Sequence, residues 1–285
     1  MPRFHPSHLL FSALLCITAP AATATAIEPA LSAATPLVIG ESFAIASAVL
    51  GETRHINVYT ARAWDTPPDA PLPVLYMPDG GIAEDFLHIA GLLQVSVANG
   101  TMRPFRLVGI ANTQRRRDLT GPTGDAKDRA IAPVVGGAAA YRSFIRDELM
   151  PQVRQRYRGT GETAIVGESL AGLFVVETLL LEPQLFDHYL AFDPSLWWNR
   201  GFLPSQAAGL LGRQGGSKRS LYIASSSEAG IASEVQRLAT VLEQSAPKGL
   251  DWHVERMPQE SHGTIYHPAA LKAFRAVFAP KMDKL

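Results

Sequence analysis

Short apolar runs recur along the chain and alternate with longer segments that have helical periodicity. Residues 42–50 and 55–61 are strand-like and are joined around Gly51, which favours an antiparallel hairpin at the edge of a sheet. The later runs are continuous, and several are bounded by Pro or Gly, as is typical of buried parallel strands. They lie at residues 73–77, 105–111, 163–166, 189–192 and 220–225.

Helices are predicted between these runs. One has a clear apolar face, formed by residues that recur at spacings of three and four: Tyr141, Phe144, Ile145, Leu149 and Val153. Pro151 is expected to kink or divide this helix. The others are predicted at residues 83–97, 170–181, 232–244 and 268–278. This alternation predicts an α/β fold in which a mostly parallel central sheet carries helices on both faces.

The N-terminal residues have the layout of a secretory signal peptide. Arg3 precedes an apolar stretch at residues 9–17, and small residues follow at 24–26. We therefore expect a signal peptide over residues 1–26, cleavage before Ile27, and a periplasmic or secreted protein. Residues 27–41 are interpreted as a tether, and residues 42–285 as a single catalytic domain. The apolar stretch is too short to cross a bilayer, and no later segment is apolar for long enough.

The cysteine count and the charge balance limit the kinds of site and partner to expect. The single cysteine, Cys16, lies in the predicted leader, so the mature chain is expected to have no disulfide, cysteine nucleophile or thiolate metal site. The chain has 26 basic and 26 acidic residues, and this balance gives no indication of nucleic acid or anionic lipid as a partner.

The strongest local motif is TAIVGESLAGLF at residues 163–174. An apolar strand runs into a turn of small residues with Ser169 at its centre, and a helix follows, which is the pattern of a nucleophile elbow. Gly167 gives the turn room before the serine. Ala171 stands where the strict pattern has a second glycine, with Gly172 directly after it, and Ala is small enough to keep the interpretation.

A serine hydroxyl needs a base within hydrogen-bond reach, and in this fold the base comes late in the chain. His262 lies in a polar loop after a strand and before the last helix, and we interpret it as the base. His267 adjoins Pro268 at the start of that helix and is interpreted as a cap. His188 and His253 lie beside or within predicted strands and are interpreted as structural.

A third group should orient the imidazole. Glu228 is preferred because it follows the predicted strand at residues 220–225, and Glu234 and Asp193 remain alternatives. The oxyanion formed during acyl transfer needs backbone N–H donors. The amide of Leu170, directly after the serine, and that of Gly81, in the loop after residues 73–77, are the candidates.

Further motifs occur in a fixed order along the chain: LYMPDG at 75–80, RRDLT at 116–120, GG at 136–137, ELMP at 148–151, PSLWW at 194–198 and SHG at 261–263. With them, residues 42–278 resemble the esterase group of α/β-hydrolases that includes siderophore (enterobactin-type) esterases, esterase D-like enzymes and mycolyltransferases. The resemblance implies Ser169 as nucleophile, His262 as base, and Gly81 and Leu170 as oxyanion donors. It also implies that a Ser–His pair can act with little help from an acid, and that Asp193 stands where relatives often have Ser.

Three side chains are expected to contact substrate. Trp197 and Trp198 follow a strand at the expected site and are able to stack on an aromatic acyl or catechol group, although packing in the core is the favoured explanation for at least one of them. Arg116 belongs to a run of three arginines that is able to attract an anionic substrate, while Asp118 after it indicates an internal salt bridge.

The expected function is that of an exported serine esterase that acts on a small-molecule ester without a metal or cofactor. A siderophore lactone is the first candidate substrate, and a feruloyl or acetyl ester of a polysaccharide is the second. An acyltransferase uses the same residues but passes the acyl group to an alcohol. A ligand-binding protein on a hydrolase scaffold is the alternative of another class.

Overall fold

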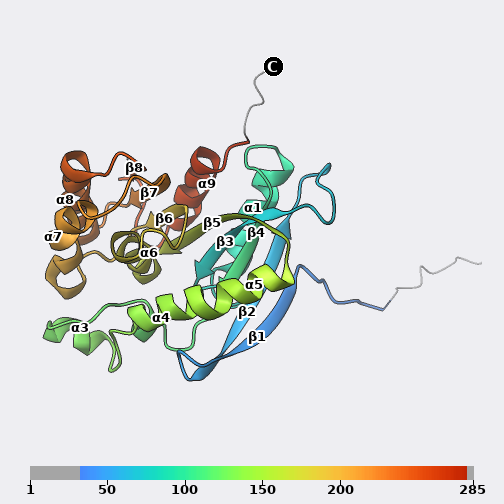
Figure 1. The fold of residues 1–285 in the computed structure, drawn as a ribbon, viewed down its shortest axis with the longest axis horizontal. Helices are drawn as coiled ribbons and strands as arrows, with labels where there is room; N and C mark the ends of the chain where they lie inside the picture. Colours follow the sequence, from blue (N-terminus) through green and yellow to red (C-terminus); the bar gives the residue numbers. More distant parts are fainter. Residues whose placement is uncertain (1–32, 281–285) are drawn as a thin grey trace, which may run out of the picture. The chain divides into compact units, whose positions relative to one another are not determined.

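The computed structural model describes residues 33–280. An eight-stranded sheet forms the centre of this part of the chain (Figure 1). The predicted signal peptide, Cys16 and the first residues of the predicted tether lie outside this part. Residues 33–40 contain no helix or strand, and the chain from Ile39 onward groups as one compact unit. No helix within residues 33–280 combines the length and apolar character needed to cross a membrane.

The sheet has the strand order β1-β2-β4-β3-β5-β6-β7-β8. Strands β1 and β2 form the predicted antiparallel hairpin, β2 pairs antiparallel with β4, and every later pairing is parallel. The strands are β1 (Glu41–Ser47), β2 (Glu52–Ala61), β3 (Leu72–Pro78), β4 (Phe105–Ile110), β5 (Gly159–Glu168), β6 (His188–Phe192), β7 (Arg219–Ser225) and β8 (Leu250–Arg256). The predicted mostly parallel sheet is confirmed.

Helices cover both faces because successive side chains of a strand point to opposite sides. In β6, for example, Tyr189 and Ala191 belong to one apolar core, and Leu190 and Phe192 belong to the other. The first core is closed by α4 (Ala138–Phe144), α5 (Met150–Arg156), α6 (Leu170–Leu181), α7 (Trp198–Leu211) and α8 (Ala229–Ser245). The second is closed by α1 (Phe86–Ala98) and α9 (Tyr266–Val277).

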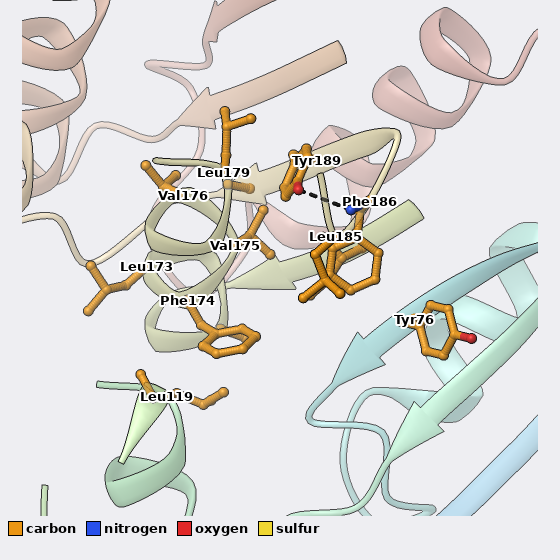
Figure 2. Packing of buried hydrophobic residues seen from close by; sticks show 14 of the residues in the cluster. Tyr76, Leu119, Leu173, Phe174, Val175, Val176, Leu179, Leu185, Phe186 and Tyr189 are labelled. Atoms are coloured by element: carbon orange, nitrogen blue, oxygen red, sulfur yellow. Dashed lines mark hydrogen bonds between the residues drawn. The ribbon is translucent and has the colours of Figure 1, made fainter. Parts of the chain in front are cut away.

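Helix α6, which follows Ser169, is apolar on nearly every side and is buried accordingly (Figure 2). Its Phe174 packs edge-on against Tyr141, with ring centroids 5.2 Å apart. To the right of α6 in Figure 2, the N–H of Phe186 donates a hydrogen bond of 3.1 Å to the hydroxyl of Tyr189, so the phenol in the core is satisfied. A helix packed in this way gives the serine at its start a rigid support.

The predicted helix over residues 141–153 is divided before Pro151. Helix α4 passes into a five-residue π-helix, η1 (Ile145–Leu149), and then into α5, where the proline lies in the first turn and needs no hydrogen-bond donor. Within η1, the carboxylate of Glu148 accepts hydrogen bonds from the hydroxyl of Ser47 (2.5 Å) and the N–H of Ala48 (2.8 Å). These bonds fasten the β1–β2 turn to the helical layer.

Residues 114–137 contain two short helices, α2 (Arg115–Asp118) and α3 (Ala126–Ile131). Asp118 is buried and is paired with Arg54 of β2 and with Arg117, whose Nε lies 2.6 Å from the carboxylate. The internal salt bridge indicated by the arginine run is therefore present. It fixes the start of this segment to the sheet.

Candidate active site

Ser169 lies on a sharp turn between β5, which ends at Glu168, and α6. Its φ of 59° and ψ of −118° are a strained conformation for a residue with a side chain. A Cβ atom on Gly167 would come within 2.6 Å of the Ala171 carbonyl carbon, so glycine is required there. A Cβ on Gly172 would come within 3.0 Å of the carbonyl oxygen of Phe192. The glycine after Ala171 therefore allows α6 to approach β6.

His262 lies between β8 and α9, and the structure brings it to Ser169 as the sequence analysis expected. Its Nε2 is 3.1 Å from the serine Oγ, and its Nδ1 is 3.0 Å from Oδ2 of Asp193. With the Nδ1 hydrogen donated to the carboxylate, the Nε2 lone pair is free to accept the serine proton. This is the geometry that activates a hydroxyl as a nucleophile.

The preference for Glu228 as the orienting acid is corrected by this geometry, because Asp193 is the carboxylate hydrogen-bonded to the imidazole. Asp193 directly follows β6 and is fully buried, and Ser226 donates to it from both its N–H and its hydroxyl at 2.6 Å. Glu228 lies further beyond the sheet, at the N-cap of α8. Within residues 33–280, no hydrogen bond joins it to His262. Glu234, the other alternative, pairs with Arg237 on α8.

The residues after β7 also hold the loop that carries the base. The N–H of Met257 donates to the carbonyl of Ser225 (2.8 Å), and the N–H of Ser227 donates to the carbonyl of Glu260 (2.9 Å). Between these two anchors, Ser226 binds Asp193. One short segment thus positions the acid and the base relative to each other.

The charges around the imidazole favour its protonated form. The hydrogen bond to Asp193 raises the pKa of His262, burial opposes this, and the negative charges of Glu168 and Glu228 add to the increase. Sequence reasoning missed Glu168, whose Oε1 is 3.4 Å from Nδ1 of His262. The only available signal was its position directly before the nucleophile.

Of the two expected oxyanion donors, the N–H of Leu170 donates no hydrogen bond within residues 33–280, whereas that of Gly81 is occupied. Leu170 is the first residue of α6, where a backbone N–H has no partner within the helix. The N–H of Gly81 donates to the carboxylate of Glu84 at 2.6 Å. Gly81 can therefore serve an oxyanion only after the exposed Glu84 side chain has moved away.

Arg116 is not brought to the serine. Its side chain is exposed and donates to the carbonyl of Ile131 (3.0 Å). The arginine that faces the site is Arg115, whose Nε and Nη2 bind the carboxylate of Asp79 at 2.7 and 2.8 Å. Asp79 has a positive φ of 57° and begins the turn that carries Gly81. Arg115 thus secures the loop that carries Gly81.

A cavity of about 250 Å³ opens beside the serine and the imidazole. Trp197 lines it and is half-buried, and Glu228 lines the same space. Trp198 is buried elsewhere, and its indole N–H donates to the carbonyl of Gly121 at 2.9 Å. Only the first tryptophan of the pair therefore faces the candidate site.

The remaining histidines belong to other contacts. His188 lies between Ser220 and Glu162, in keeping with a structural role. His267 does not cap α9, since the N-cap is Ile265. Instead its ring is hydrogen-bonded to His88 at 3.1 Å, which corrects the interpretation as a cap. Among residues 33–280, no group of three or more His, Cys, Asp or Glu side chains is placed to hold a metal ion.

Comparison with known proteins matches the chain to a family of esterases. Residues 47–255 match the model of a family described as "Putative esterase". The ferri-bacillibactin esterase BesA of Bacillus subtilis is 30% identical over 172 residues, which are 53% of this chain and 57% of the relative. The siderophore triacetylfusarinine C esterase of Aspergillus fumigatus is 34% identical over 169 residues, 52% of this chain and 53% of the relative. The chain thus spans little more than half the length of these curated relatives.

A solved structure extends the likeness over most of the fold. The IroE-like serine hydrolase from Shewanella oneidensis has a TM-score of 0.75 and 27% sequence identity, and the match covers 84% of this chain and 80% of that one. The BES protein from Bacillus cereus, 20% identical, has a TM-score of 0.74 over 86% of this chain and 98% of that chain. The sheet described above is therefore that of an α/β-hydrolase.

Proposed function

Because the chain belongs to the family described as "Putative esterase", we propose that it is a serine hydrolase that cleaves carboxylic esters. The observation that carries the proposal is the continuous line of contacts from Ser169 through His262 to Asp193. A ligand-binding protein has no need for a strained serine held against an oriented imidazole.

The reaction follows from these contacts. Ser169 Oγ attacks the ester carbonyl while His262 Nε2 takes its proton, and buried Asp193 stabilises the resulting imidazolium. The oxyanion accepts a hydrogen bond from the N–H of Leu170 and, once Glu84 has moved, from that of Gly81. The tetrahedral adduct expels the alcohol, which receives the proton from His262. Water then gives a proton to His262 and attacks the acyl-enzyme. The second tetrahedral adduct releases the acid, and Ser169 Oγ takes the proton back from His262.

A siderophore ester is the substrate class that fits best. The curated relatives are named for esters of bacillibactin and triacetylfusarinine C. In this chain Trp197 gives the cavity beside the serine an aromatic wall on which a flat acyl group is able to stack. Comparing kcat/KM for a catecholate trilactone with kcat/KM for a feruloyl ester tests the substrate class, and a clear preference for the feruloyl ester would reject it.

We also propose that the protein acts outside the cytoplasm, because the sequence of residues 1–26 has the layout of a secretory leader. The N-terminal residue of the protein recovered from periplasm or medium tests this. The expected residue is Ile27, and an uncleaved chain confined to the cytoplasm would contradict the proposal.

The decisive experiment on the mechanism treats the purified protein with a fluorophosphonate, which reacts with activated serines. We expect the label on Ser169, and we expect it to be lost in both Ser169→Ala and His262→Ala, since the hydroxyl is a poor nucleophile without its base. Peptide mass spectrometry locates the label.

Ser195→Ala is the matched control, because this neighbouring hydroxyl lies only 3.4 Å from the Ser169 oxygen. The label is expected to stay on Ser169 in this variant. Folded protein that remains unlabelled, or label found on another serine, would refute the proposed mechanism.

A further inference from the structure

Two carboxylates, not one, flank the N–H of the imidazole. Asp193 Oδ2 lies 3.0 Å from His262 Nδ1, and Glu168 Oε1 lies 3.4 Å from the same atom. Glu168 is the last residue of β5 and directly precedes the nucleophile, so its backbone is held by the sheet. Its side chain is only 17% exposed. The Glu168 carboxylate is therefore held within the site by the sheet and is largely shielded from solvent.

The two carboxylates differ in what supports their charge. Asp193 accepts two hydrogen bonds from Ser226 in addition to that of His262. No hydrogen bond to the Glu168 carboxylate occurs among residues 33–280. Besides the imidazole, Arg115 is the cation whose charge acts on Glu168, and its Nε and Nη2 are already bound to Asp79. The charged form of Glu168 thus depends mainly on His262.

We propose that Glu168 is a second positioning residue of the catalytic pair, whose ionised carboxylate lies beside the imidazole N–H that Asp193 accepts and stabilises the imidazolium formed during each proton transfer. This inference rests on the proposed esterase function and deepens it. A second negative charge at about this distance favours the charged imidazole, and it does so most in the transition state, where the imidazolium develops.

The two groups titrate as a coupled pair. Burial raises the pKa of Glu168 to about 7, while the positive charges of His262 and Arg115 oppose the increase and the negative charges of Asp193 and Asp79 add to it. His262 in turn faces Asp193, Glu168 and Glu228. At low pH Glu168 is neutral, and Asp193 is then the charged member of the two carboxylates that flank Nδ1. As the pH rises and Glu168 ionises, the basicity of His262 increases.

The test is Glu168→Gln, which removes the charge and keeps the shape. Two quantities are measured: the titration of the His262 ring by NMR, assigned with His262→Ala, and the pH profile of kcat/KM for a p-nitrophenyl ester. We expect the His262 midpoint and the acidic limb of the profile to move to lower pH by about one unit. We expect kcat to fall about tenfold, because one unit of basicity corresponds to that factor in rate.

Two further variants make the result specific. Glu168→Asp keeps the charge but withdraws it by one methylene group. In this variant the midpoint of the His262 titration should therefore lie between that of the wild type and that of Glu168→Gln. Glu243→Gln removes the same charge from the exposed side of α8 and should leave both quantities unchanged.

An unchanged His262 titration in Glu168→Gln would overturn the proposal. So would a loss of activity without movement of the midpoint, since that is what a purely structural role predicts. The NMR titration needs no turnover. If the wild type hydrolyses no ester, the esterase proposal fails, and the midpoint still decides whether Glu168 acts on His262.

Discussion

The carboxylate of Asp193 is oriented before any substrate arrives. It is fully buried, and its hydrogen bonds from Ser226 fix both oxygens. A pre-oriented buried acceptor holds the imidazole in the tautomer that leaves Nε2 unprotonated. Glu228 affects the same imidazole only through its charge across the cavity.

This difference predicts unequal effects of two isosteric variants. Asp193→Asn presents an amide that is able to donate to Nδ1 and so to select the wrong tautomer. We expect kcat to fall about a thousandfold or more. Glu228→Gln removes only a distant charge, and we expect a loss of less than about tenfold. Steady-state kinetics with one ester compares the two, and equal losses would contradict Asp193 as the orienting acid.

At the scale of elements, the loop after β3 depends on close contact between two strands. A Cβ atom on Gly80 would lie 2.3 Å from the Cα of Gly109 in β4, a distance that forces backbone to move. In the same region, Asn57 donates to the carbonyl of Gly80 at 2.8 Å. The loop that presents Gly81 is therefore set by backbone packing as well as by Arg115.

Gly80→Ala is accordingly expected to lower the free energy of unfolding by about 1 to 3 kcal/mol, the usual effect of overpacking. Gly91→Ala is the matched control. Gly91 lies within α1, and a Cβ there meets no atom within 4 Å. The same substitution should raise the free energy of unfolding there by up to about 1 kcal/mol, because alanine favours a helix. Urea denaturation measures both, and a stable Gly80→Ala would show that the loop can shift.

Elements with continuous local patterns were predictable, and those that depend on distant contacts were not. Strands β1 to β7 and α6 follow patterns in the sequence itself, whereas β8 (LDWHVER) has no apolar run and its range was not predicted. Helix α7 was not predicted, because its start contains a left-handed turn at Asn199, Arg200 and Gly201, where φ is 49°, 57° and 69°. Asn199 is held there by contacts to Gly124 and Asp128, which lie far away in the sequence.

At the scale of the molecule, the site is formed where β5, β6 and β7 end side by side. Ser169 and His262 were predictable because each lies in a local motif with a fixed place in the fold. The acid was not, because it depends on the register between strands. Phe192 of β6 is paired with Ala224 of β7, so Asp193 comes level with the end of β7 and next to Ser226, while Glu228 lies beyond. A sequence does not display that register directly.

The strand order also separates the parts of the site along the chain. Ser169, Glu168 and Asp193 lie within 26 residues of one another, counting from 168 to 193, whereas the loop with His262 follows the edge strand β8. Ribosomes deliver the chain from its N-terminus. A nascent chain therefore has its hydroxyl and its acids well before it has a base. Activation of the Ser169 hydroxyl is therefore expected only after the ribosome has delivered the loop of His262, which follows β8 and precedes α9.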